Sequence, residues 1–401
     1  MRAGTPGRVE FVALMAMLVA TVAFSIDAML PALPRIGQEL TPEALNRAQL
    51  IVTSFILGLG VGTFFTGPLS DSFGRKRVIL CGAAVYMAGA ALAAMAPTLE
   101  LILAARVLQG LGAATARVVP LAIIRDLYSG REMARIVSFV MMVFTLAPAV
   151  APLVGSGIIV LAGWRGIFGS FILFATISSL WLTLRLAEPL PREARRPFSA
   201  SALKEALRAV LAPPVVRIAI AVQTLCLTTL FSSISSIQQL FEVTFHRADQ
   251  FPLWFFMMAI CAGTGSFLNA SLVMRLGMRR MISATLALQI GLTSIVLALF
   301  LIGLPEGLRF PVYLVWQTTI FFQAALTLGN INALAMEPLG HVAGMAASVV
   351  GALATVGSVI LTIPVGLAFD GTPLPLLTGV LVAVSVARYL MVRLHRAEEY
   401  A

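Results

Sequence analysis

The chain has 401 residues, of which 59% are hydrophobic and only 11% are charged. Soluble domains contain about 45–50% apolar and about 25% charged residues, so this composition excludes a soluble domain and predicts a protein embedded in a membrane. The formal net charge of +10 would suit a nucleic-acid partner, but the placement of the basic residues along the chain explains the charge more simply.

A membrane-spanning helix needs about 20 consecutive, mostly apolar residues. Twelve stretches of the sequence meet this requirement and account for most of the chain. Their centres lie near Met17, Leu57, Met87, Leu108, Val143, Phe174, Thr228, Ala259, Ile290, Phe321, Val356 and Leu381. We therefore predict an all-α membrane protein with twelve transmembrane helices.

Lysine and arginine residues gather on one side of this twelve-span arrangement. The N-terminal segment, the loops after even-numbered spans and the C-terminal segment hold 21 of the 28 basic residues, the other loops hold 5 and the spans hold 2. Cytoplasmic segments carry such an excess of positive charge. The pattern predicts a multi-pass protein with both termini in the cytoplasm, and it gives no reason to expect nucleic acid as a partner.

The first span carries an acid in an otherwise apolar helix. Asp27 follows 16 uncharged residues and precedes Pro31 by four positions. Because proline lacks the N–H that would bond to the carbonyl of Asp27, the helix is expected to bend there. Burial disfavours a charged carboxylate, so we predict that Asp27 is neutral in one state of the protein and charged in another. The alternative is that it pairs with a buried arginine, Arg106 or Arg117, and stays charged.

The loop after the second span contains the stretch GPLSDSFGRKR, which begins at Gly67. Gly67 is expected to allow close approach of helices, and Gly74 can take a positive φ angle. Asp71 is expected to cap a neighbouring helix N-terminus, while Arg75 and Lys76 anchor the loop at lipid headgroups. A generic basic loop would explain the cations but not the positions of the glycines and the aspartate.

The polar residues of the fourth span share one face. Arg106, Gln109, Gly110, Ala113 and Arg117 fall at i, i+3, i+4, i+7 and i+11, which is one side of a helix. Since charges avoid lipid, this face is expected to line a cavity. The second arginine, Arg117, would favour anionic or neutral compounds over cations.

The fifth span contains Pro148, Pro152 and Gly155 in the stretch TLAPAVAPLVGSG. Two prolines one turn apart free the carbonyls of Phe144 and Pro148 and soften the helix, as suits a helix that slides or seals against its neighbours. A plain proline kink without a role in coupling is the alternative. Across the first half we predict helix hinges at Pro31, Gly110, Pro148, Pro152 and Gly155.

A polar linker divides the chain into two halves. Residues 188–214 contain apolar positions at helical spacing, which predicts a short amphipathic helix on the inner membrane surface. The bundles on either side, 1–187 and 215–401, resemble each other, because Gly277 of MRLGMRR follows Gly74 of DSFGRKR by 203 residues. Two six-helix bundles are the layout expected of secondary transporters with a site between the repeats.

The second half has no acid deep in a span, and its polar residues there are amides and hydroxyls. We therefore expect coupling chemistry in the first half, and binding and gating in the second. Aromatic and polar side chains of both halves suggest an adaptable substrate cavity, although such residues often face lipid or the core instead. The predicted members of this cavity are Phe24, Asp27, Arg117, Gln238, Trp254 and Gln323.

The loop beginning at Gly67 matches the pattern G-x-x-x-D-x-x-G-R-[KR] completely, and on this motif the sequence resembles the major facilitator superfamily. Other stretches resemble its drug:proton antiporters of the bicyclomycin/chloramphenicol-resistance type. These stretches, found from Asp27 to the last spans, are DAMLPALP, LILAARVLQGLGAA, RDLYSGRE, APAVAP and EPLGHVAG.

The resemblance implies a latch that closes the cytoplasmic side. In that family the aspartate of the loop signature, here Asp71, docks on the eleventh span. The arginine, here Arg75, meets the acid of the RD pair, here Asp126. Gly67, Gly74 and Lys76 complete this predicted latch.

The resemblance also implies residues for proton transfer. In proton-coupled members the pattern R-x-x-Q-G-x-G has this role, which here points to Arg106 and Gln109 beside Asp27. The fifth span resembles the antiporter signature G-P-x-x-G-G, but Ala151 and Ser156 replace two of its glycines.

Together these features predict a proton-coupled secondary transporter that exports drugs or other small amphiphilic molecules by proton antiport with alternating access. The alternatives on the same fold are export of an endogenous metabolite and proton-coupled uptake. A receptor or scaffold that binds without transporting is disfavoured because the loop signature, Asp27 and Arg106 are all present.

An enzyme is not expected. The three histidines lie in loops or the tail without a second ligand at metal spacing, and there is no Walker-type phosphate loop for ATP. We expect no cofactor and no metal. The expected partners are a small-molecule substrate, protons and the lipid bilayer, and the resemblance implies a monomer in a bacterial inner membrane.

Overall fold

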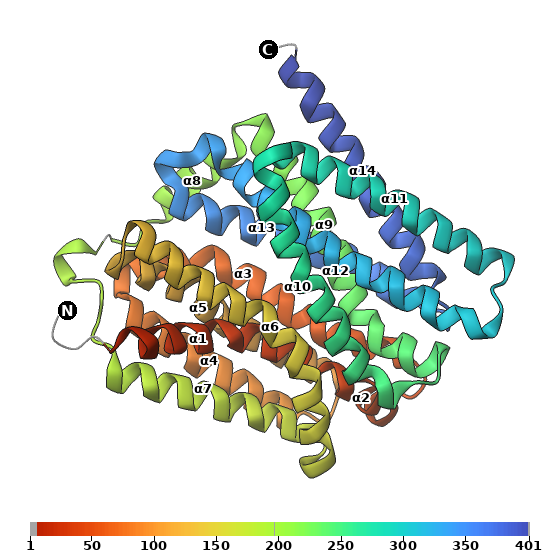
Figure 1. The fold of residues 1–401 in the computed structure, drawn as a ribbon. Coiled ribbons are helices and arrows are strands. Elements are labelled where there is room, and N and C mark those ends of the chain that lie inside the picture. The colour runs from red at the N-terminus through yellow and green to blue at the C-terminus, as the bar shows by residue number, and fades with distance from the viewer. Residues whose placement is uncertain (1–5, 196, 400–401) are drawn as a thin grey trace. The chain divides into compact units, whose positions relative to one another are not determined.

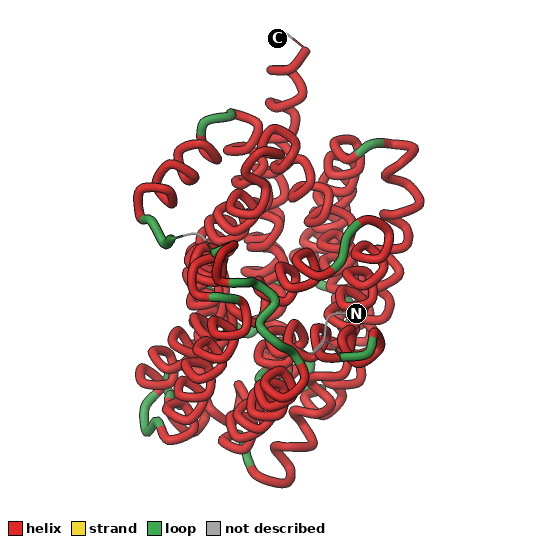
Figure 2. Tube along the Cα trace, turned by 90° about the vertical axis from the view of Figure 1, so that its left-hand side faces the viewer, coloured by secondary structure: helices red, strands yellow, loops and turns green. Residues whose placement is uncertain are grey.

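The computed structural model describes residues 6–195 and 197–399, with the backbone alone described at residues 200, 202, 340–344 and 395–399. Every regular element in these residues is a helix (Figure 2). Twelve helical stretches are long and apolar enough to cross a membrane. The predicted all-α membrane fold with twelve spans is thus confirmed.

The chain forms two compact units, of which the first comprises the described parts of residues 1–42 and 54–206. Its helices run from red to yellow-green in Figure 1. Helix α3 begins at Leu50, four residues before the second stretch of this unit. They are α1 (Arg8–Asp27), η1 (Leu30–Ala32), α2 (Leu33–Leu40), α3 (Leu50–Phe73), α4 (Arg75–Met95), α5 (Leu99–Leu127), α6 (Gly130–Ala162), α7 (Arg165–Arg185), η3 (Arg192–Ala194) and α8 (Ala200–Leu211), which extends into the second unit.

The second unit comprises the described parts of residues 43–53 and 207–401. Its short N-terminal piece is joined to the rest by Asn46, whose side-chain amide donates a hydrogen bond of 2.8 Å to the carbonyl of Leu367. The helices are η2 (Leu45–Gln49), α9 (Pro214–Gln239), η4 (Leu240–Thr244), η5 (Ala248–Gln250), α10 (Phe251–Leu276), α11 (Met278–Ile302), α12 (Glu306–Met336), η6 (Glu337–Val342), α13 (Ala343–Leu367) and α14 (Leu374–Glu399).

The linker forms a helix where the apolar spacing predicts one. In α8, Ala206 and Val210 are buried, whereas Lys204, Glu205 and Arg208 are exposed. The apolar side chains therefore share one face of the helix. Its position on a membrane surface stays a prediction.

The spans are apolar on nearly all sides because they meet either the core or lipid. In the first unit, one buried cluster joins Phe11 of α1, Ile79 of α4, Val119 of α5, Val140 of α6 and Leu182 of α7. Outward positions are equally apolar, as the exposed leucine and methionine side chains show. A helix that is hydrophobic all round is typical of a membrane span.

Glycines bring α4 and α5 unusually close together. A Cβ atom added at Gly112 would lie 2.4 Å from the carbonyl oxygen of Gly82 and 2.5 Å from the backbone nitrogen of Tyr86. Small residues at such crossings let helix backbones pack directly, which is a main source of helix association in membranes. The position of α5 in the unit therefore depends on the absence of a side chain here.

We predict that Gly112→Ala destabilises the protein, because the new methyl group overlaps backbone atoms that cannot rotate away. Overpacking of this kind costs about 1–3 kcal/mol. Gly169→Ala on α7 is the matched control, since a Cβ there has no atom within 4 Å. Thermal unfolding in detergent measures the difference, and equal melting temperatures for both variants would contradict the tight crossing.

Candidate functional site

The first span is interrupted next to its acid. Helix α1 ends at Asp27, a 3₁₀ turn with Pro31 at its start follows, and α2 then begins at Leu33 with Pro34 in its first turn. The sequence predicts a bend at this point, and the structure changes helix type there, although the residues between α1 and α2 keep helical backbone angles and Arg8–Leu40 forms one span. Proline fits the first turn of a helix, where no N–H donor is needed, so each proline begins a new element.

Asp27 is buried and has no partner for one of its oxygens. The residue is 3% exposed, and its Oδ1 atom is buried without a hydrogen bond to any described residue. No described lysine or arginine forms an ion pair with it. The alternative that a buried arginine holds Asp27 in its charged form is therefore not supported. A buried polar atom without a partner is uncommon and calls for an explanation.

Arg106 binds the backbone at this break instead of the acid. Its side chain is completely buried and donates to Oε1 of Gln109 at 2.7 Å and to the carbonyl of Ser25 at 3.0 Å. The guanidinium carbon also lies 4.3 Å from the centre of the Phe55 ring, within the range of a cation–π contact. The carbonyl of Ser25 belongs to the last turn of α1, where helical partners run out. Arg106 thus satisfies part of the helix end that carries Asp27.

Two residues that the sequence analysis missed complete this network. The hydroxyl of Ser25 lies 2.6 Å from the hydroxyl of Tyr86, and both side chains are buried. The network therefore joins α1 and α4 as well as α5. A signal for Tyr86 was present, because it carries the only hydroxyl group of α4.

The fifth span touches the break from another side. A Cβ added to Gly155 of α6 would lie 2.3 Å from the carbonyl oxygen of Ala28, the residue directly after Asp27. Helix α6 runs without interruption through Pro148 and Pro152. Two predicted hinge regions, at Pro31 and Gly155, are therefore in backbone contact. Whether they act as hinges stays a prediction, as it does for Gly110.

The predicted latch residues form one cluster at the start of α4. Nε of Arg75 donates to Oδ2 of Asp126 at 2.7 Å, so the pair expected from the resemblance is present. The same guanidinium also donates to Asp71 and to the hydroxyl of Ser70. The Arg75 side chain is only 9% exposed, and the two carboxylates compensate its charge. Gly74 has φ of +101°, as expected.

One detail of the predicted loop is wrong. Lys76 does not reach out from the loop, because its Nζ donates to the carbonyls of Thr183 and Leu186 at the end of α7, at 2.9 and 2.8 Å. The cap of α4 is Glu188, which accepts the backbone N–H groups of Arg75 and Lys76 at 2.7 and 3.1 Å. The cation of Lys76 at the C-terminal end of α7 and the anion of Glu188 at the N-terminal end of α4 each interact favourably with the helix dipole there. That Asp71 caps a neighbouring helix stays a prediction.

The predicted cavity residues of the second unit do not form one group. Trp254 lies beside Phe310 in an aromatic cluster, with 5.7 Å between ring centres, and donates to Gln250. Gln323 donates to Thr229 at 3.4 Å, and its own carbonyl oxygen is buried without a partner among the described residues. The side-chain oxygen of Gln238 is also buried without a partner among the described residues.

The remaining cavity residues of the first unit also differ from each other. The Phe24 ring packs on Phe171 and Phe174 of α7, each with 5.4 Å between ring centres, which is ordinary helix packing. Arg117 is half-buried and makes no hydrogen bond or ion pair with another described side chain. Of these two, Arg117 alone retains unused donors for a ligand.

We predict that Glu188→Ala lowers the free energy of unfolding by about 0.5–2 kcal/mol, the usual loss for a helix N-cap. The control is Glu193→Ala, a nearby exposed acid of the same linker. Thermal unfolding in detergent compares the two variants. A loss of stability no larger for Glu188→Ala than for Glu193→Ala would show that the cap contributes nothing.

Comparison with known proteins identifies the family. The model of the Major Facilitator Superfamily matches residues 14–362. The uncharacterized MFS-type transporter YdgK of Bacillus subtilis is 34% identical over 194 residues, about half (48%) of either chain. The bicyclomycin resistance protein homolog of Haemophilus influenzae is 27% identical over 94% of this chain and 95% of its own.

A solved structure shows the same fold. A D-xylose-proton symporter has a TM-score of 0.74 at 15% sequence identity, covering 95% of this chain and 97% of its own. At this identity the likeness extends to the fold alone. With the family model spanning most of the sequence, the chain belongs to the major facilitator superfamily, whose members are transporters and not enzymes.

Proposed function

We propose that the protein is a proton-coupled secondary transporter that exports drugs or other small amphiphilic molecules by proton antiport. Asp27 is the coupling acid in this proposal. The observation that carries it is the burial of this carboxyl at the end of α1, with one oxygen unpartnered and no cation paired to it among the described residues.

The proton has a clear physical role at such a position. A charged carboxylate without a partner at this depth costs several kcal/mol or more, so the buried arrangement suits the protonated acid. Deprotonation adds a negative charge, which must be solvated by water or compensated by a cation or a substrate. The equilibrium between conformations then depends on the proton, because the two protonation states favour different surroundings.

Arg106 and the fifth span would transmit this change. Arg106 holds the carbonyl of Ser25, two residues before the acid, and Gly155 contacts the carbonyl of Ala28, one residue after it. A rearrangement at Asp27 therefore acts on both neighbouring helices. The Arg75, Asp71 and Asp126 cluster, which is formed in the same structure as the buried Asp27, would hold the cytoplasmic side closed in the outward-open state.

Export of drugs is favoured by the relatives. The match to a bicyclomycin resistance protein homolog runs almost end to end, and this name connects that protein with resistance to an antibiotic. Export of an endogenous metabolite and proton-coupled uptake remain the alternatives on this fold. Arg117, which has no partner among the described side chains, favours neutral or anionic cargo over cations, so both kinds of compound belong in a test.

The setting of the transporter is part of the proposal. The excess of basic residues in the inward segments supports cytoplasmic termini. The bacterial relatives support an inner-membrane location. We propose that one chain suffices for transport, because each unit has its own core and the coupling residues lie within the first.

We predict that Asp27→Asn abolishes proton movement while preserving substrate binding. The amide keeps the size of the side chain but cannot release a proton. Proteoliposomes with a trapped pH dye are challenged with phenicols, bicyclomycin-like compounds, cationic dyes and anionic metabolites. A compound that drives proton movement in wild type is then tested with the variant, and its binding, followed by tryptophan fluorescence, should change by less than about twofold.

Glu43→Gln is the control for this experiment, because Glu43 is an exposed acid shortly after the first span. It should couple protons to substrate as wild type does. Coupling by Asp27→Asn at the wild-type rate would remove Asp27 from the mechanism and redirect the search to Arg106 and to substrates that carry their own proton.

A further inference from the structure

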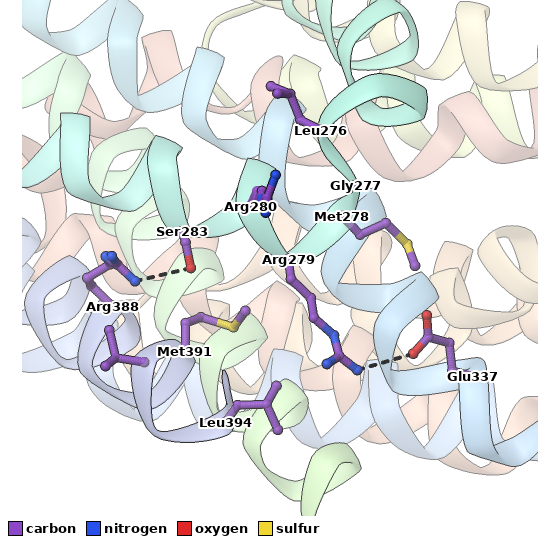
Figure 3. A pocket seen from close by; sticks show the side chains of 11 residues that line it. Leu276, Gly277, Met278, Arg279, Arg280, Ser283, Glu337, Arg388, Met391 and Leu394 are labelled. Carbon is purple, nitrogen blue, oxygen red and sulfur yellow. Dashed lines mark hydrogen bonds and ion pairs between the residues drawn. The ribbon is translucent and has the colours of Figure 1, made fainter. Parts of the chain in front are cut away.

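A cavity of about 630 Å³ is lined by residues of the second unit alone. It lies where α11 begins and α14 approaches its end, beside Glu337 at the end of α12 (Figure 3). These three chain positions belong to the same side of the membrane, the one predicted to be cytoplasmic.

The charged groups around the cavity are mostly positive. Arg279, Arg280 and Arg388 line it, and Glu337 is its one acid among the described residues. Met391 and Leu394 of α14 add an apolar wall between the arginines (Figure 3). The lining therefore combines a net positive charge with an apolar side.

Arg280 and Arg388 have donors to spare. Arg388 donates one hydrogen bond of 3.1 Å to Ser283, of the five N–H groups that a guanidinium carries. Arg279 faces Glu337 across 3.7 Å, and both side chains are 39% exposed or more, so this pair is weak. Arg280 is exposed and has no hydrogen bond or ion pair with another described side chain.

Among the described residues, no anion occupies the start of α11 as Glu188 occupies the start of its counterpart α4. Gly277, with φ of +79°, precedes α11 as Gly74 precedes α4. At α4 the first N–H groups bind the carboxylate of Glu188, but no described side chain caps α11. The residue 203 positions after Glu188 is Met391, which lines the cavity and carries no charge.

We propose that this cavity binds a phosphate group supplied from outside the chain. Arginine guanidinium groups match the oxygens of a phosphate in paired hydrogen bonds, and a helix start adds further N–H donors. The apolar wall suits the glycerol and upper acyl region of an anionic phospholipid, and basic pockets between spans on the cytoplasmic side are typical of headgroup binding. Inorganic phosphate offers the same chemistry without the apolar part.

Binding is measured by native mass spectrometry on the full-length protein in detergent, with dioleoylphosphatidylglycerol, dioleoylphosphatidylcholine and inorganic phosphate as separate probes. We expect phosphatidylglycerol to bind more tightly than phosphatidylcholine. Arg280→Gln and Arg388→Gln should each weaken its binding about fivefold, as expected for one basic residue near an anionic lipid.

Arg393→Gln is the matched control on α14, because this arginine stacks on Tyr389 and does not line the cavity. It should leave the affinity unchanged. Phosphatidylglycerol binding that inorganic phosphate does not displace identifies the lipid as the source, whereas arginine-dependent binding of inorganic phosphate alone identifies a soluble anion.

Affinities that are equal in wild type, Arg280→Gln and Arg388→Gln for both anionic probes would overturn the proposal. Arg280 is exposed and without a described partner, so Arg280→Gln is expected to fold and keeps the test decisive if Arg388→Gln does not.

Discussion

The first unit depends on how a helix end is stabilised inside the membrane. A break in a span frees backbone carbonyls where water is absent, and each must find a partner within the protein. Here the prolines after Asp27 make the break, and Arg106 donates to the carbonyl of Ser25. Because Arg106 is also held by Gln109 and lies against Phe55, the break is fixed to α5 and α3 together.

This arrangement explains why the acid is left alone. A guanidinium engaged with a carbonyl, an amide and an aromatic ring compensates the helix end, and its charge is not directed into an ion pair with Asp27. An ion pair would hold the acid in its charged form and oppose proton exchange. Leaving the carboxyl without a cation keeps its charge free to change, which is what coupling to a proton gradient requires.

The two halves use related loops differently. Both have a glycine of positive φ before a span that begins with basic residues. In the first half the buried Arg75 forms ion pairs with Asp71 and Asp126. Glu188 caps the helix start by accepting backbone N–H groups. In the second half one weak pair with Glu337 faces an open, basic cavity. The two halves therefore share the turn but differ in the described anions around it.

The sequence was most informative for features that follow from local composition and helical spacing. Long apolar stretches predicted twelve spans, and the spacing on α5 brought Arg106 and Gln109 to one face, where they bond. It was least informative for caps, because Glu188 follows Arg75 by 113 residues and no local pattern connects them. The paired prolines predicted a bend but not the 3₁₀ turn between α1 and α2, since proline's tolerance at a helix start competes with its effect inside a helix.

The central claim is that Asp27 holds a proton in the buried arrangement. Infrared difference spectroscopy of the protein in lipid, with isotope-labelled aspartate, detects the carbonyl stretch of a protonated carboxylic acid directly. The account predicts such a band at neutral pH in wild type, its loss in Asp27→Asn, and its decrease when a transported substrate binds. A wild-type spectrum without a protonated aspartate, or one that is unchanged in Asp27→Asn, would contradict it.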